Sequence, residues 1–191
     1  MLPLPIYRIN METTFVELLR NCLKESHDTL EATMADVTED VAHFAPGGKA
    51  LPIAAAYAHI LVSEDMLLSG MVTKKPALLD GEWKDKLGLS EPHPAMDNDW
   101  EKNFSAWSTT VKADMAQLKE YGQAVFKQTD DFLAPLKDAD LIAMKADLSQ
   151  WEMGEWDLAK FVIRMMIGHV DSVLGEISAV KGLQNMKGYP F

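Results

Sequence analysis

Apolar residues recur three, four or seven positions apart along most of the chain, with polar residues between them. This spacing places the apolar side chains on one face of a helix, so it predicts amphipathic helices with that face buried. On this basis we predict four long helices, at about 12–35, 52–70, 97–134 and 156–181. No residue from 53 to 62 is charged, so the second helix is expected to be buried on most sides.

Proline, glycine and polar residues gather between these helices. Ala45-Pro46-Gly47-Gly48 is a turn signal, and 71–99 forms a long connection that is expected to cover a cavity at one end of the molecule. We expect one short helix around 82–89 and an extended segment around 141–144. No strand pattern competes with the helices. The sequence therefore predicts an all-α four-helix bundle that forms a single domain over residues 1–191.

The charge balance excludes some classes of partner. Lysine and arginine number 18 against 29 acidic residues, which gives a net charge of −11. Such a surface repels phosphate backbones and anionic lipids, so we expect neither nucleic-acid nor membrane binding. The start of the chain lacks the pattern of a signal peptide, and no apolar run has the length of a membrane span.

The cysteine content indicates the compartment. Cys22, the single cysteine, cannot build an internal disulfide framework, which favours a cytoplasmic location. Because it lies in a helical apolar pattern, we expect a buried and unreactive thiol.

The histidines fall into two groups. His27 and His93 are expected to be solvated, and His43 to have a cap or surface role. His59 and His169 instead lie within the apolar parts of two predicted helices, where an unpaired imidazole would cost about 1–3 kcal/mol. Either one alone is most simply a core histidine with a hydrogen-bonding partner. Two on separate helices of one bundle also suit a shared metal site.

Two segments carry a family resemblance. "APGGKALPIAAAYAHILVSEDMLL" contains His59 followed by Glu64, and "FVIRMMIGHVDSVLGEISAVKG" contains His169 followed by Gly175-Glu176-Ile177. Both segments, and the order of helices, resemble the DinB-like superfamily of four-helix bundles, which are described as metal-dependent enzymes. The resemblance implies three histidines that hold a divalent ion such as nickel or zinc. It also implies chemistry like that of thiol-dependent transferases and isomerases.

The chain departs from that pattern at one position. The resemblance places a third histidine four residues after His169, where this sequence has Val173, and valine offers no donor. The predicted metal residues are therefore His59 and His169 alone, and we expect nickel or zinc to be bound weakly or not at all. The sequence identifies no catalytic residue.

Two functions remain open at this stage. One is an enzyme that acts on a small electrophile or a thiol adduct. The other is a non-catalytic bundle that binds a small apolar ligand among its methionines and tryptophans, or that acts as a homodimeric interaction or stress-response protein. A homodimer is expected in either case. The tryptophans considered for that pocket are Trp100, Trp107, Trp151 and Trp156. The residues expected to lie outside the bundle core and to support a dimer are Leu133, Leu141 and Ile142.

Overall fold

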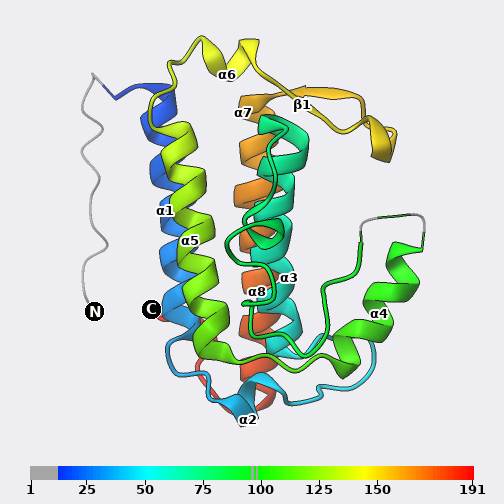
Figure 1. The fold of residues 1–191 in the computed structure, drawn as a ribbon. Coiled ribbons are helices and arrows are strands. Elements are labelled where there is room, and N and C mark those ends of the chain that lie inside the picture. The colour runs from blue at the N-terminus through cyan, green and yellow to red at the C-terminus, as the bar shows by residue number, and fades with distance from the viewer. Residues whose placement is uncertain (1–12, 96, 98) are drawn as a thin grey trace.

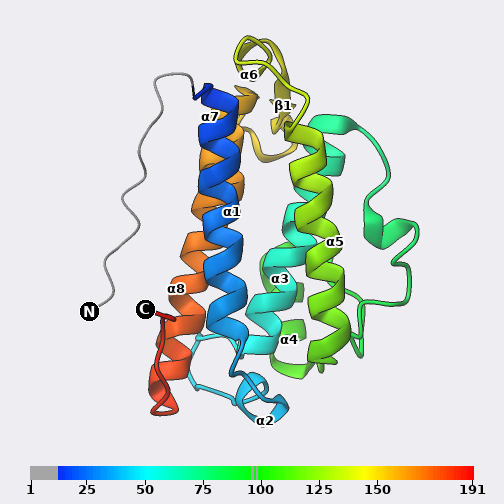
Figure 2. The same cartoon turned by 90° about the vertical axis from the view of Figure 1, so that its left-hand side faces the viewer.

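Four long helical rods run side by side along the molecule in a computed structural model that describes residues 13–95, 97 and 99–191 (Figure 1). The bundle predicted from the spacing of apolar residues is confirmed. The rods are α1 (Phe15–Met34), α3 (Ile53–Met66) with the π-helical η1 (Leu67–Thr73), α5 (Met115–Leu133), and α7 (Leu158–Phe161) with the π-helical η4 (Val162–Ile167) and α8 (Gly168–Leu183). From the side, α1 lies beside α8 and α3 beside α5 (Figure 2).

The first rod begins at a capping box. The Thr14 side chain accepts the Glu17 N–H, and the Glu17 carboxylate accepts the Thr14 N–H, so two backbone donors at the helix start are satisfied. The predicted start at residue 12 lies outside the described residues. Cys22 is partly exposed instead of buried, because the buried face of α1 runs through its neighbours Leu19 and Leu23.

The second rod is buried nearly all round, as its lack of charge predicts. Every residue from Ile53 to Asp65 is buried except His59, which is partly exposed. Pro52 stands just before the first turn, where its missing N–H costs nothing. The helix continues through η1 to Thr73, a little beyond its predicted end. The burial of this central helix is therefore interrupted at His59.

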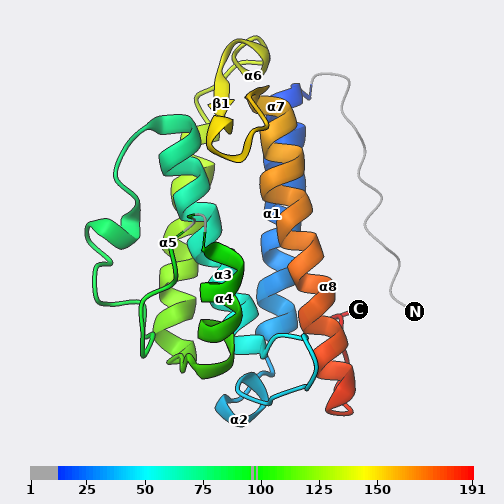
Figure 3. The ribbon, with the colours of Figure 1, turned by 90° about the vertical axis from the view of Figure 1, so that its right-hand side faces the viewer.

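The predicted third helix is wrong as a single element. It is divided into α4 (Trp100–Thr110) and α5, and α4 lies outside the four rods on the side of α3 (Figures 1 and 3). The link 111–114 is extended, and its backbone pairs with 88–90 of the long connection. Asp114 then caps α5 by accepting the N–H groups of Ala116 and Gln117.

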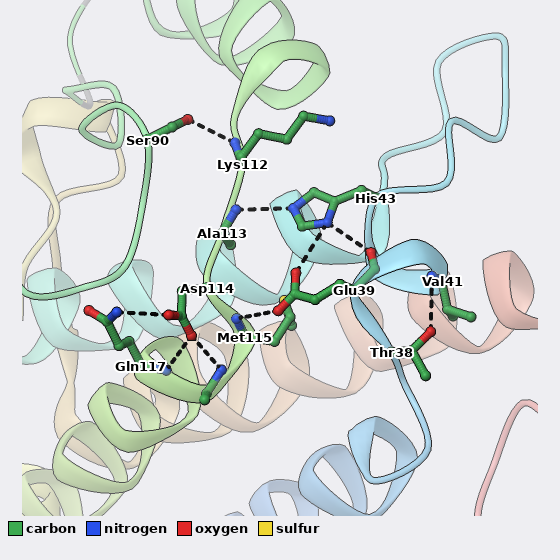
Figure 4. A network of polar contacts seen from close by, with 11 residues as sticks. Thr38, Glu39, Val41, His43, Ser90, Lys112, Ala113, Asp114, Met115 and Gln117 are labelled. Atoms are coloured by element: carbon green, nitrogen blue, oxygen red, sulfur yellow. Dashed lines mark hydrogen bonds and ion pairs between the residues drawn. The ribbon is translucent and has the colours of Figure 1, made fainter.

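A histidine fixes the same link from the other side (Figure 4). His43 follows the short helix α2 (Glu39–Ala42); its Nδ1 donates to the Glu39 carbonyl and its Nε2 accepts the Ala113 N–H at 3.0 Å. The Glu39 carboxylate accepts the N–H of Met115 at the start of α5. His43 thus has the structural role expected of it, since both of its nitrogens bind backbone.

The long connection is attached to the bundle through a buried carboxylate. Asp65, fully buried on α3, accepts the N–H groups of Leu78 and Leu79 at 3.0 Å and the Tyr121 hydroxyl at 2.8 Å. These bonds hold the 3₁₀ turn η2 (Leu78–Asp80) against α3 and α5. The short helix expected around 82–89 is absent from the described residues, which form turns there.

A small cap covers the upper end of the bundle in Figure 1. The segment expected to be extended at 141–144 is instead helix α6 (Asp140–Ala143), and the strand follows it. Strand β1 (Lys145–Asp147) pairs antiparallel with β2 (Glu155–Asp157) around the 3₁₀ turn η3 (Ser149–Trp151). The last rod consequently begins at Leu158, two residues later than predicted.

The cap also buries two side chains expected on the outside. Leu133 and Leu141 are each 1% exposed, because they pack with the ends of α1 and the last rod in one apolar cluster; Ile142 is 59% exposed. Within the described part of the chain, no helix is both long and apolar enough to cross a membrane.

Candidate functional site

The structure brings His59 and His169 together. His59 projects from the middle of α3 and His169 from the second position of α8, two rods in direct contact. Their ring centroids are 5.1 Å apart in an edge-to-face arrangement. The sequence therefore identified two imidazoles that meet across the bundle.

A pocket of about 280 Å³ opens beside this pair. Its walls come from α3, the long connection, α4, the cap and the last rod. Both π-helical segments contribute a side chain, Leu67 from η1 and Met165 from η4. Such π turns shift the side chains of a helix relative to regular geometry and are frequent at functional sites. The lining residues are His59, Ser63, Leu67, Asp97, Trp100, Trp151, Met165 and His169.

A third histidine reaches the pair from the long connection. His93, expected to be solvated, is partly buried, and its Nε2 lies 3.2 Å from His59 Nδ1. Its ring packs edge to face on Trp107 at 4.9 Å between centroids and lies near Trp100 at 5.4 Å. No periodicity marks a loop residue between two prolines as buried, so the sequence offered no signal for this contact.

Burial keeps these imidazoles neutral. Burial, together with the smaller effect of charge on His169 and His93, lowers the pKa of His59 from 6.5 to about 3. Burial likewise lowers the pKa of His93 to about 4, against a weaker opposing effect of the Pro94 carbonyl. The pKa of His169 is also lowered by burial, partly offset by the negative charge of Glu64. Near pH 7 each ring therefore has one N–H donor and one acceptor nitrogen.

His27 was expected to be solvated, and this is wrong. The side chain is buried, and its Nε2 bonds to Glu64 Oε2 at 2.8 Å, while Thr129 donates to Glu64 Oε1 at 2.7 Å. Its ring stacks on Phe126 with centroids 3.8 Å apart. His27 thus ties α1, α3 and α5 together away from the pocket.

The donors at the site do not fit a three-histidine metal centre. Val173 is 5% exposed within the core and has no donor atom. His93 is no substitute in this arrangement, because its Nε2 bonds to His59 and its Nδ1 to the Pro94 carbonyl at 3.0 Å. Across residues 13–95, 97 and 99–191, no group of three or more His, Cys, Asp or Glu side chains is placed to hold a metal ion.

The fold and the site together define a class of protein: a four-helix bundle whose second and last rods present a pair of imidazoles to a small pocket. The family model for the DinB superfamily matches residues 23–177, a range that includes the whole pair, and the chain belongs to that superfamily.

A solved structure with the same fold is the conserved protein of locus from Enterococcus faecalis. It aligns with a TM-score of 0.72 and 18% identity, covering 90% of this chain and 97% of that one. No curated protein matches the chain.

Proposed function

We propose that the chain binds a small molecule in the pocket beside His59 and His169. The observation that carries the proposal is the interruption in the burial of α3 at His59. Twelve of its first thirteen residues are buried, and the one that is not, His59, lines a pocket of about 280 Å³. A bundle that only needed a core would fill this position with an apolar side chain, as it does at Val173.

The pocket lining indicates the kind of molecule. Trp100 and Trp151 offer flat apolar surfaces, and Leu67 and Met165 add flexible ones. The two neutral imidazoles provide polar contacts at one place, where they can hydrogen-bond a ligand or accept its proton. This chemistry favours a compact, mostly apolar molecule with one polar group.

Metal-assisted transfer or isomerisation of a thiol adduct, as the family resemblance implies, is the second candidate. The observation in its favour is the contact of His59 and His169 across facing helices, where bundles build metal sites. Two imidazoles without a third donor bind divalent ions weakly, so we propose that nickel or zinc is held loosely or not at all. The single cysteine, partly exposed and free, supports the cytosol as the proposed location.

Binding is testable by tryptophan fluorescence with indole, phenol and benzoate as probes. We expect saturable quenching by at least one probe, because Trp100 and Trp151 line the pocket. The variants Trp100→Phe and Trp151→Phe should each reduce the quenching. Trp83→Phe is the matched control, since Trp83 packs on Tyr121 outside the pocket. Absence of saturable quenching, or quenching that only Trp83→Phe removes, would contradict the proposal.

A further inference from the structure

A chain of hydrogen bonds runs from the backbone of the long connection to the pocket. The Pro94 carbonyl lies 3.0 Å from His93 Nδ1, His93 Nε2 lies 3.2 Å from His59 Nδ1, and the Ser63 hydroxyl lies 3.2 Å from the same His59 nitrogen. A carbonyl oxygen only accepts, so the direction of the chain is determined at this end.

The donor at the Pro94 carbonyl also determines which ring donates in the hydrogen bond between His93 and His59. His93 Nδ1 must carry the proton that it donates to the Pro94 carbonyl, so a neutral His93 has an unprotonated Nε2 that accepts. The hydrogen between the two rings then belongs to His59 Nδ1. The Ser63 oxygen shares this N–H as a second acceptor, and its own hydrogen points elsewhere.

The relative position of the His59 and His93 rings agrees with a hydrogen bond between them and not with a metal ion that both bind. Their planes differ by 10°, and their centroids are 5.5 Å apart although the two nitrogens are 3.2 Å apart. These distances differ by about the width of one imidazole ring, so the nitrogens face each other along the line between the centroids. An ion between them would need nitrogens about 4 Å apart on that line, given metal–nitrogen distances of about 2.0–2.1 Å.

We propose that His93 is a positioning residue that fixes His59 as the Nδ1–H tautomer and thereby leaves Nε2 as the acceptor nitrogen offered to the pocket. The tautomer follows from hydrogen bonds within the chain, independently of any ligand. Its consequence for the ligand rests on the proposed function. The polar group that meets His59 is a hydrogen-bond donor, such as a hydroxyl, thiol or amine, and not a carboxylate.

The tautomer is measurable by ¹⁵N-detected NMR of the histidine-labelled protein. We expect the wild type to show a protonated Nδ1 and an unprotonated Nε2 for His59. His93→Gln should preserve this pattern, because a glutamine amide oxygen can accept at the place of His93 Nε2. His93→Ala should give a mixture of tautomers. His43 is an internal reference in the same spectra, since its Nδ1 donates to Glu39 and its Nε2 accepts from Ala113 (Figure 4), and neither substitution changes a residue of this contact.

A binding experiment tests the consequence for the ligand. Anisole is the methyl ether of phenol, in which a methyl group replaces the hydroxyl hydrogen, so it cannot donate a hydrogen bond, and a pocket with a free Nε2 should bind phenol several-fold more tightly. This preference should persist in His93→Gln and fall in His93→Ala, with far-UV circular dichroism confirming that both variants fold.

The outcomes separate the two proposals. An Nε2–H tautomer for His59 in the wild type, or an unchanged tautomer in His93→Ala, would overturn the role of His93. If indole, phenol and benzoate all fail to bind while the tautomers are as expected, the proposed function fails and the role of His93 in fixing the ring stands. Equal binding of phenol and anisole would contradict only the consequence for the ligand.

Discussion

At the scale of single residues, the chemistry of the pocket depends on which imidazole nitrogens carry a proton and on the missing metal-binding atom at Val173. His59 has one nitrogen fixed by His93, and His169 approaches the same space from the opposite rod. Val173, one turn beyond His169, contributes packing where a third imidazole would complete a metal centre. At this position a single side chain therefore separates the two-histidine arrangement from a three-histidine set of metal ligands.

Introducing a third histidine at position 173 should strengthen metal binding. In Val173→His the new imidazole lies one turn from His169, and we expect the affinity for Ni²⁺ or Zn²⁺ to rise at least roughly tenfold, since even outer partners of metal ligands contribute 10–100-fold. Titration calorimetry measures this change. Ser172→His is the matched control, because Ser172 is on the same helix but exposed.

The wild-type protein, purified without an affinity tag, should contain less than one ion per chain by elemental analysis. A full equivalent of tightly held metal in the wild type, or equal gains in both histidine variants, would contradict this account of the site.

Burial of neutral imidazoles also makes stability depend on pH. His59 and His93 bind protons in the unfolded chain below their ordinary pKa of 6.5, but in the folded chain only near their lowered pKa values of about 3 and about 4. The unfolded state therefore takes up more protons between these limits, and stability should fall as the pH drops from about 6.5 toward 4. Thermal unfolding at pH 7 and pH 5 should show a smaller loss in His93→Gln than in the wild type, because glutamine does not titrate. An equal loss would argue that His93 is not buried as a neutral ring.

At the scale of elements, the pocket exists because helices depart from regular geometry and a loop is held in place. The π-helical η1 and η4 each supply one wall residue, and α4 leaves the bundle to supply Trp100. The connection that presents His93 is attached through Asp65, whose carboxylate accepts donors from the connection and from α5. Asp65, a buried residue of α3, thus helps to hold the connection that contains His93.

Removing that carboxylate should loosen the connection. In Asp65→Ala the partly buried N–H groups of Leu78 and Leu79 and the buried Tyr121 hydroxyl lose their acceptor, so we expect a destabilisation of at least about 3 kcal/mol in urea unfolding. Amide hydrogen exchange at Leu78 and Leu79 should accelerate in native conditions. Asp131→Ala is the control, since Asp131 pairs with Lys127 on the exposed face of α5 and should change stability by well under about 1 kcal/mol. Unchanged exchange at η2 would show that Asp65 does not hold the connection.

The sequence predicts the elements that depend on local spacing, but not those that depend on contacts between distant segments. The rods follow from local spacing, and so does the choice of His59 and His169 as a pair, because each lies in an apolar helical run. The break before α5 does not follow from spacing, since Trp107, Val111 and Met115 continue the apolar pattern through it. Contacts with 88–90 and with His43, both distant in sequence, determine the break. His93 was missed for the same reason, since only tertiary contacts bury it.

At the scale of the whole molecule, the question is whether one chain is the functional unit. Two of the three residues expected to support a dimer, Leu133 and Leu141, are used inside the molecule by the cap. Ile142 remains exposed on α6, at the same end of the bundle as the exposed Phe15 on α1. A homodimer therefore stays a prediction, and its support now rests on this end of the bundle.

Light scattering during size-exclusion chromatography measures the mass directly. We expect twice the chain mass of 21.3 kDa, because large exposed apolar side chains at one end favour self-association. Ile142→Glu should shift the protein toward the monomer by placing a charge in the contact, whereas Ile163→Glu, on the exposed side of η4, should not. A monomeric wild type would end the homodimer prediction, and a dimer that survives Ile142→Glu would place the contact elsewhere.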